Sequence, residues 1–170
     1  MITSRIKQAT NDDLPDIIRI WSQGVGDAMG GLQSDSDFDL EMVFDFFKNL
    51  VAMQNDVHKF WLYLDDSNIP IGYCSILPFQ TSPLLYNKWA ILSLYIDKNH
   101  QNSSVGFHLS KHALEYASTT TIKYIMATIS STNHRVKRLS EMMGWKVVGK
   151  LPHEVADNDL PETEIIVFEA

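Results

Sequence analysis

The sequence feature that most constrains the fold is residues 89–96, WAILSLYI, where nearly every side chain is apolar. A strand with one solvated face alternates apolar and polar residues, so a continuous apolar run is typical of a central strand covered on both faces. Strand-like runs also occupy residues 60–64 and 71–77, and the turn-forming sequence DDSN lies between them. The middle of the chain therefore predicts neighbouring strands near the centre of a sheet.

The residues before these strands follow the period of a helix. Residues 10–15 (TNDDLP) combine a capping hydroxyl, acids for a first helical turn and a proline whose missing N–H is not needed there. Gly24, Gly26, Gly30 and Gly31 break the pattern that follows, so we expect a flexible stretch there. The apolar face of this first helix carries Leu14, Ile17, Ile18 and Trp21.

Three more helices are expected, at residues 39–53, 105–117 and 133–143, the last of which stops at Gly144. The buried stripe expected for the helix at 39–53 consists of Leu40, Val43, Phe44, Phe47, Leu50 and Val51. The inward faces expected for the other two carry Ser110, Ala113, Leu114 and Ala117, and Val136, Leu139, Ser140 and Met143.

Short strands complete the pattern, at residues 4–9, 124–129, 146–150 and 165–169. The expected order is β-α-α-β-β-β-α-β-α-β-β, which predicts an α/β fold class with a mixed sheet flanked by helices. A chain of 170 residues with 45% hydrophobic and 21% charged residues suits one domain with one sizeable core. We therefore expect residues 1–170 to form a single domain.

Charge and cysteine content narrow the function classes. The chain carries 14 basic and 21 acidic residues, a net charge of -7, which argues against nucleic acid or an anionic membrane as a partner. The lone Cys74 excludes an intramolecular disulfide and a site built from several cysteines. No secretory signal or membrane-spanning run is recognisable, so the expected location is cytoplasmic.

The segment with the most chemical content is the polar turn between residues 96 and 105. An apolar strand ends there, small polar residues follow, and a helix begins at about Val105. The first N–H groups of a helix lack internal partners and carry partial positive charge, so this arrangement can cradle a phosphate. The alternative is a plain strand-to-helix turn. Neither the Gly-Lys-Ser/Thr of a nucleotide loop nor the repeated glycines of a dinucleotide site is present.

These segments resemble the GNAT superfamily of N-acyltransferases. The acetyl-CoA motif of that family, Gln/Arg-x-x-Gly-x-Gly/Ala behind aliphatic-Tyr-aliphatic-Asp, is similar to LYID (94–97) and QNSSVG (101–106). Asn133 and RLSEMMGW (138–145) resemble the family's Asn-x-x-Ala-x-x-Leu-Tyr-x-x-x-Gly-Phe. IKQATNDDLP (6–15) is similar to its first strand and helix, so the resemblance covers nearly the whole chain.

The resemblance implies a GNAT-like fold, with a mostly antiparallel central sheet of six to seven strands, about four helices, and strands four and five splayed. It implies acetyl-CoA as co-substrate, with an amine attacking the thioester directly in a ternary complex. The backbone amide near Tyr95 would stabilise the oxyanion of the tetrahedral intermediate. The implied cofactor-binding residues are Leu94, Tyr95, Ile96, Gln101, Asn102, Ser103, Ser104, Val105, Gly106, Phe107, Asn133, Lys137 and Arg138. A basic cluster of His134, Arg135, Lys137 and Arg138 would neutralise the CoA phosphates, or else is a solvated helix face.

The chain departs from the family pattern at three places. Ser104 replaces a glycine beside the expected phosphate. Ser140 stands where the family often has a tyrosine that protonates the leaving thiolate, and it is our candidate catalytic side chain. Serine is a poor acid, so that role is lost, taken by water or passed to another residue. Residues 89–96 contain no carboxylate for a general base; candidates elsewhere are Asp27, Glu41, Glu164, His153 or a water relay.

The acceptor side is rich in acids, which would attract a cationic amine or else simply solvate helix starts and loops. These acids are Asp27, Asp35, Asp37, Asp39, Glu41, Asp45, Glu154, Asp157, Asp159, Glu162 and Glu164. His108 and His112 lie four residues apart, but no third ligand follows at a suitable spacing, so we expect no metal.

The favoured hypothesis is an acetyl-CoA-dependent N-acetyltransferase (an acyltransferase, EC 2.3.1) that acts on a primary amine of a small molecule or amino acid. The alternatives are a catalytically degenerate acetyl-CoA-binding regulatory module and an interaction domain that binds no CoA. A homodimer and a monomer both stay open.

Overall fold

The computed structural model describes residues 5–28, 39–79, 82–101, 103–151 and 162–170, with side chains left out for residues 25–28. The strands are β1 (Ile6–Gln8), β2 (Lys59–Leu64), β3 (Pro70–Pro78), β4 (Trp89–Ile96), β5 (Tyr124–Ser130), β6 (Lys146–Leu151) and β7 (Thr163–Glu169). The α-helices are α1 (Leu14–Ala28), α2 (Leu40–Ala52), α3 (Val105–Ala117) and α4 (His134–Met142). Short 3-10 turns η2 (Asn11–Asp13) and η3 (Lys98–His100) precede α1 and follow β4.

The strands form one seven-stranded sheet in the order β1-β2-β3-β4-β5-β7-β6. Every neighbouring pair is antiparallel except β4 and β5, which run parallel because the chain crosses over through α3 between them. The expected mixed, mostly antiparallel sheet flanked by helices is confirmed.

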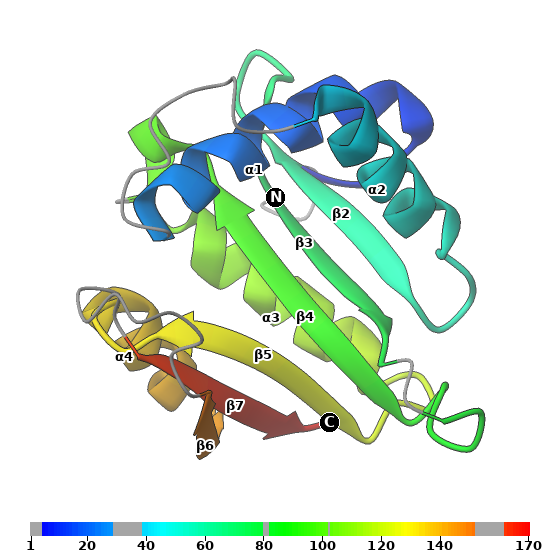
Figure 1. Cartoon of the computed structure of the whole chain (residues 1–170), viewed down its shortest axis with the longest axis vertical. Helices are drawn as coiled ribbons and strands as arrows, with labels where there is room; N and C mark the ends of the chain where they lie inside the picture. The colour runs from blue at the N-terminus through cyan, green and yellow to red at the C-terminus, as the bar shows by residue number, and fades with distance from the viewer. Residues whose placement is uncertain (1–4, 29–38, 80–81, 102, 152–161) are drawn as a thin grey trace.

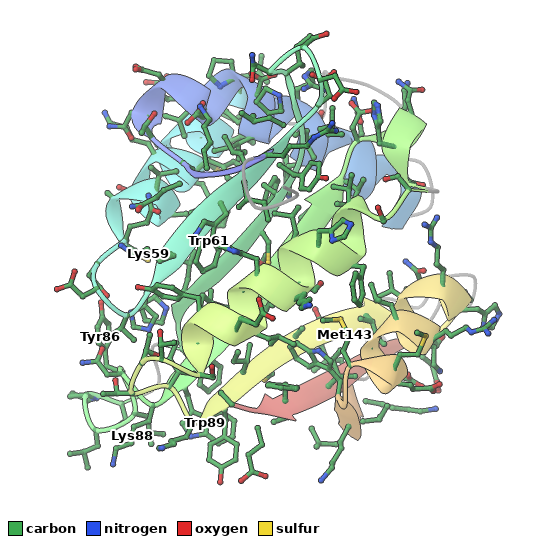
Figure 2. All side chains as sticks on the ribbon, turned by 180° about the vertical axis from the view of Figure 1, so that it is seen from behind. Lys59, Trp61, Tyr86, Lys88, Trp89 and Met143 are labelled. Atoms are coloured by element: carbon green, nitrogen blue, oxygen red, sulfur yellow. The ribbon has the colours of Figure 1, made fainter. Side chains whose placement is uncertain are left out.

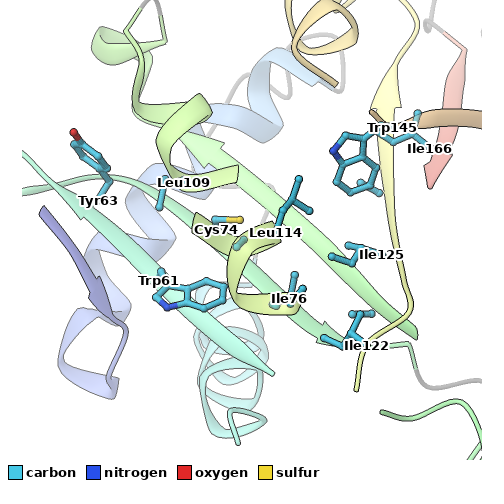
Figure 3. Packing of buried hydrophobic residues seen from close by; sticks show 14 of the residues in the cluster. Trp61, Tyr63, Cys74, Ile76, Leu109, Leu114, Ile122, Ile125, Trp145 and Ile166 are labelled. Carbon is cyan, nitrogen blue, oxygen red and sulfur yellow. The ribbon is translucent and has the colours of Figure 1, made fainter. Parts of the chain in front are cut away.

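Helices cover both faces of the sheet, as Figure 1 shows: α1 and α2 lie on one face, and α3 and α4 lie on the other. Each layer has its own buried cluster. Leu14, Ile17 and Phe47 pack with the sheet on the face of α1 and α2. On the other face, α3 and the strands bury the cluster shown in Figure 3, in which Leu109 and Trp145 take part.

β4 and β5 are paired only at one end. Their register runs from Trp89↔Tyr124 to Ile91↔Met126, and no pairing follows beyond Ile91 among the described residues. In Figure 1 the two strands diverge from this end towards α1 and α4. The expected splay of strands four and five is therefore confirmed, and it explains why most of β4 is only partly buried.

The cap expected at residues 10–13 is present, and α2 begins where the sequence predicted a helix. Thr10 and Asp13 form a capping box ahead of α1, and the Asp39 side chain accepts hydrogen bonds from the first turn of α2. Gly144, with a φ of 89°, follows the last turn of α4 in the left-handed region that favours glycine.

Two expectations about the first two helices are wrong. The helix is not broken at Gly24 and Gly26, because α1 continues through both to Ala28, whereas Gly30 and Gly31 lie outside the described residues. In α2, Leu40 and Phe44 are exposed by 67% and 42%, so only Val43, Phe47 and Val51 form its buried stripe. Leu40 and Phe44 are exposed because α2 contacts the sheet with only a narrow face, and both residues lie beside that face.

None of the helices in the described part of the chain is long and apolar enough to span a membrane.

Candidate active site

A cavity of about 160 Å³ lies where β4 and β5 part, bounded by α3 and α4. Most of its lining residues are apolar, and its serine and threonine residues are Ser93, Ser110, Thr128 and Ser140. In Figure 2, which views the sheet from behind, the labelled Met143 lies beside β5 at this cavity, whereas Trp89 marks the end where β4 and β5 pair. The lining residues are Leu92, Ser93, Leu94, Tyr95, Ser110, Ala127, Thr128, Ile129, Val136, Leu139, Ser140, Met143, Trp145 and Ile166.

The backbone of β4 has a free edge on this cavity. Residues 92–96 pair with β3 on one side, but their pairing with β5 has already ended. Alternate N–H and C=O groups of a strand point to its two sides, so the groups of β4 that face the cavity have no strand partner within the described chain. This is the edge at which the resemblance to the GNAT superfamily implies that Leu94, Tyr95 and Ile96 meet acetyl-CoA.

The start of α3 lies directly beyond the free edge of β4. A Cβ atom added to Gly106 would be 3.9 Å from both Ile96 Cγ1 and Leu94 Cδ2, so the first turn of the helix rests on β4. Ser104 is the N-cap residue, and its side chain makes no capping hydrogen bond. Such a helix start presents N–H groups and partial positive charge to a ligand.

The amides of this turn are partly available. The Ser103 N–H donates to His100 O at 3.0 Å, and the Val105 N–H donates to Ser103 Oγ at 3.3 Å. Among the described residues, no acceptor lies within hydrogen-bonding distance of the Ser104 or Phe107 N–H. Of the predicted phosphate donors, the Ser104 and Phe107 amides therefore have no acceptor among the described residues, whereas the Ser103 and Val105 amides already donate within the loop.

Ser104 fits its position without strain. Its φ of -81° is accessible to any L-amino acid, so the glycine of the family motif is not required here for backbone conformation. The side chain is exposed, as is Gln101, which closes the preceding 3-10 turn. Asn102 lies outside the described residues.

One basic residue of α4, Arg135, reaches the same loop. Arg135 Nη2 donates to Ser103 O at 3.2 Å, which joins the start of α4 to the turn before α3. Arg138 is exposed. Lys137, in contrast, is paired with the buried carboxylate of Glu164 at 2.9 Å, so its charge is already partly neutralised inside the protein.

The two polar α4 residues singled out from the sequence both have local structural partners. The Asn133 side chain caps α4 by accepting from the Val136 N–H at 3.1 Å. Ser140 is buried and lines the cavity as expected, but its hydroxyl donates to Lys137 O at 2.8 Å in the preceding turn. Its proton is therefore committed within the helix.

An ion-pair network under the loop was not foreseen from the sequence. Arg19 of α1 donates to Asp97 at 2.7 Å, to Asp16 at 2.9 Å and to Pro70 O at 2.7 Å. Burial alone would raise the pKa of Asp97, but its hydrogen bonds, led by the Asn99 N–H, outweigh burial and lower it. Arg19 and Asp97 are 78 positions apart, and no local pattern in the sequence pairs them.

The Tyr95 side chain is held on the opposite face of the sheet from the cavity helices. Its ring stacks on Tyr73 with centroids 5.2 Å apart, and a Cβ atom added to Gly24 of α1 would come within 2.6 Å of it. Burial raises the pKa of both tyrosines. The β4 backbone at Tyr95 is thereby fixed between two elements.

The acids expected at the acceptor side are largely engaged in structural roles where they are described. Asp39 caps α2, Glu162 pairs with Lys150, and Glu164 pairs with Lys137. Glu41 and Asp45 are exposed. Of the remaining acids and base candidates, Asp35, Asp37, His153, Glu154, Asp157 and Asp159 lie outside the described residues, and so does the side chain of Asp27.

No group of three or more His, Cys, Asp or Glu side chains that could hold a metal ion lies among the described residues.

A seven-stranded mixed sheet, splayed between β4 and β5 with a cavity in the splay that α3 and α4 bound, defines a GNAT-like fold. The acetyltransferase (GNAT) family matches residues 21–145, and the chain belongs to this family of acetyltransferases.

Solved structures agree with this fold. A candidate phosphinothricin N-acetyltransferase is 22% identical, with a TM-score of 0.80 and 96% of each chain covered. Ribosomal-protein-alanine N-acetyltransferase from Brucella melitensis is 20% identical, with a TM-score of 0.77 over 97% of this chain and 99% of that one. A phosphinothricin acetyltransferase from Sinorhizobium meliloti, in complex with acetyl-CoA, is 16% identical, with a TM-score of 0.76 over 96% and 86%. No curated protein sequence matches the chain.

Proposed function

We propose that the chain transfers an acetyl group from acetyl-CoA to a primary amine of a small molecule or amino acid, by direct attack in a ternary complex. The observation that carries this proposal is the cavity in the β4–β5 splay, together with the first turn of α3, which rests on the same strand β4 at Leu94 and Ile96. A long ligand with an anionic end and a thioester end matches that arrangement. The acetyl-CoA complex of the similar Sinorhizobium meliloti enzyme supports the choice of ligand.

The proposed cofactor site has two parts. The free edge of β4 at Leu94, Tyr95 and Ile96 takes the pantetheine arm. The residues proposed to hold the diphosphate are Gln101, Asn102, Ser103, Ser104, Val105, Gly106 and Phe107. The Ser104 and Phe107 amides, for which the described residues offer no acceptor, support this part most directly.

α4 supplies the remaining contacts in the proposal, from Asn133, Lys137 and Arg138. Arg138 can meet a phosphate as it stands, and Arg135 joins it because it already contacts the loop. Lys137 would have to share its charge with Glu164, and Asn133 would act with its amide N–H₂ while its oxygen caps the helix. We therefore expect Arg138 and Arg135 to contribute more to CoA affinity than Lys137.

For the chemistry, we propose that a backbone amide at Tyr95 polarises the thioester carbonyl and stabilises the oxyanion. The stacking of the Tyr95 ring on Tyr73 keeps that amide in place before the reactants bind. Holding both reactants in one site contributes further through orientation. Ser140 stays in the proposal as a contact to the sulfur, which requires its hydroxyl to leave Lys137 O.

The acceptor is proposed to be a small amine, attracted by the acidic balance of the chain, a net charge of -7. We place this single-domain enzyme, residues 1–170, in the cytoplasm. An acyl-transfer assay across a panel of amines, with free CoA thiol as the readout, tests the reaction. Amine-dependent thiol release is expected for at least one small amine.

The second candidate function is a regulatory module that binds acetyl-CoA without turnover. The observation in its favour is Ser140, whose hydroxyl is engaged inside α4 and is not offered to the thioester. Binding of acetyl-CoA with no thiol release for any amine in the panel would support this candidate and contradict the enzyme.

A further inference from the structure

His58 is a buried histidine, directly before β2, that the proposed function does not use. Its side chain is completely buried, and its Nε2 is one of two buried side-chain polar atoms without a hydrogen bond in the described part of the chain. The other is Oε2 of Glu164, which lies 2.9 Å from the Lys137 ammonium and is paired there. A histidine gains its charge near neutral pH, so the surroundings of this ring decide how the protein responds to acid.

The Asn55 side chain determines which nitrogen of the ring carries the proton. Asn55 Oδ1 accepts from the Val57 and His58 N–H groups at 2.7 and 2.9 Å, so the Nδ2 amide is the group that faces the ring. Nδ2 lies 3.3 Å from His58 Nδ1. A neutral imidazole has one acceptor and one donor nitrogen, so Nδ1 accepts from Asn55 and the proton is on Nε2.

A second proton can bind only at Nδ1. There it would point an N–H at the Asn55 amide, which is also a donor, and the hydrogen bond between them would be lost. Burial lowers the pKa of His58 below its ordinary value of 6.5, the Tyr86 backbone offsets part of this, and no charged group of the described chain contributes. The titratable side chains on the adjoining segments are Lys48 near the end of α2, Asp56 and Lys59 beside the ring in the sequence, and Tyr86 and Lys88 on the loop after β3.

The ring joins two loops that are distant in the sequence. Asn55 belongs to the loop between α2 and β2, and Tyr86 belongs to the loop between β3 and β4. The Tyr86 ring packs edge-on against the His58 ring, with centroids 5.4 Å apart. The neutral ring therefore contacts both loops, through a hydrogen bond to one and an aromatic contact to the other.

The second of these loops leads to the place where β4 and β5 pair. Figure 2 shows Tyr86, Lys88 and Trp89 at this corner of the molecule. Lys88 O accepts from the Lys123 and Tyr124 N–H groups at 2.8 and 3.1 Å, and the β4–β5 pairing starts at the next residue, Trp89. A change at His58 is thereby passed to the paired end of the two strands that enclose the cavity.

We propose that His58 is a pH-sensitive switch between the loop after α2 and the loop before β4. The neutral ring holds the two loops together. When Nδ1 takes a proton from solvent, the ring loses its hydrogen bond to Asn55 and leaves its buried position, which releases Tyr86 and loosens the paired end of β4 and β5. The inference concerns the folded domain and does not depend on the proposed acetyl transfer.

Urea unfolding of wild type and His58→Asn tests the proposal, because asparagine offers an acceptor without titrating. A histidine that is neutral when folded and titrates normally when unfolded loses its stabilising contribution below about pH 6.5, which raises the unfolding equilibrium constant by up to about tenfold between about pH 7.5 and 5.5. We expect this additional rise in wild type and not in His58→Asn. His108→Gln removes a half-buried histidine that stacks on Tyr63, and as the control it should keep the wild-type rise. Equal rises in wild type and His58→Asn, or loss of the rise in His108→Gln, would overturn the proposal.

Hydrogen exchange, corrected for the intrinsic effect of pH, locates the opening. At about pH 5.5 the amides of residues 55–58 and 85–89 are expected to lose up to about tenfold of their protection in wild type and to keep it in His58→Asn. No loss in these segments, or a loss spread evenly over the domain, would overturn the proposal.

Two further measurements address the Asn55 contact itself. Nitrogen NMR of the His58 ring at neutral pH should show the proton on Nε2, and a proton on Nδ1 would contradict the proposal. Asn55→Asp places a carboxylate against Nδ1, which favours the charged ring. We expect the acid-induced rise in the unfolding constant to become smaller in this variant, and a larger rise than in wild type would overturn the switch.

Discussion

Arg19 of α1 and Asp97 at the end of β4 form an ion pair of 2.7 Å that ties the first helix to the loop before α3. The Asp97 side chain also accepts from the Asn99 N–H at 3.0 Å, so one carboxylate holds both the helix and the turn. It is only 5% exposed, which protects the pair from solvent. Asp97 therefore fixes the loop that is proposed to hold the diphosphate to α1.

Arg19→Met is expected to destabilise the protein and weaken acetyl-CoA binding. The change leaves a buried carboxylate without its cation, and hydrogen bonds to charged groups contribute about 1.5–3 kcal/mol. Because the Arg19 side chain is 39% exposed, we expect the lower end, about 1.5 kcal/mol, in urea unfolding. Asp16→Asn removes only the exposed partner of Arg19 and is the control, with a change below about 0.5 kcal/mol. Equal losses in both variants would contradict a special role for Asp97.

The same carboxylate predicts a pH dependence. The folded protein lowers the pKa of Asp97 below its ordinary value of 3.8, so its ionised form contributes stability above that pH. This contribution is lost as the pH falls through the lower folded pKa. The free energy of unfolding, measured by urea titration at several pH values, should therefore fall more steeply below about pH 4 in wild type than in Asp97→Asn. Parallel curves would contradict the assignment.

Gly106→Trp is expected to abolish acetyl-CoA binding without unfolding the domain. A Cβ atom at Gly106 makes ordinary contacts of 3.9 Å with Ile96 and Leu94, so Gly106→Ala fits and is the control. The indole of tryptophan would instead extend from the first turn of α3, where the diphosphate is proposed to bind. Calorimetric titration should give an affinity near wild type for the alanine variant and a loss of at least about tenfold for the tryptophan variant. Wild-type affinity in both would place the cofactor elsewhere.

Gly24 and Tyr95 are expected to be coupled. An alanine in place of Gly24 ordinarily favours a helix by about 1 kcal/mol, but here its Cβ would come within 2.6 Å of the Tyr95 ring. The ring is backed by Tyr73, so we expect Gly24→Ala to destabilise the protein by about 1–3 kcal/mol. In a Tyr95→Ala background the same change should become neutral or stabilising. A double-mutant cycle of unfolding energies with no coupling would contradict the contact.

Lys137 and Glu164 are expected to act as a structural pair. Lys137→Met leaves the buried Glu164 carboxylate without a cation, and we expect a loss of up to about 3 kcal/mol in unfolding free energy. Combining it with Glu164→Gln should recover part of the loss. Lys150→Met breaks the exposed pair with Glu162 and is the control, with no measurable change expected. A larger effect on CoA affinity than on stability would show that Lys137 acts mainly on the cofactor.

Much of the fold could be predicted from local patterns. The apolar run at residues 89–96 does form the central strand β4, and Asp39 and Gly144 bound their helices as expected. The glycine at position 24 was misread as a helix breaker, since its actual role is to make room for the Tyr95 ring, which lies far along the chain. Helix propensity depends on a residue and its neighbours in the sequence, so it cannot predict a contact with a residue far along the chain.

The location of the candidate site was predictable from the sequence, but the hydrogen-bond and ion-pair partners of its residues were not. The loop before α3 and the cavity-facing side of α4 follow from the motifs, and Ser140 does line the cavity. Its bond to Lys137 O, the pairing of Lys137 with Glu164, and the network at Asp97 depend on tertiary packing. Ser110 was expected on the inner face of its helix, and it lies there and lines the cavity.

Thermal melting of the wild-type protein with and without acetyl-CoA tests the central claim most directly. Ligand at about 100 times its dissociation constant stabilises a folded protein by about 2.7 kcal/mol, which corresponds to a rise of roughly 5–10 °C for a domain of this size. We predict such a rise with acetyl-CoA and none when Gly106→Trp is melted under the same conditions. An unchanged melting temperature for wild type at millimolar acetyl-CoA would contradict the account.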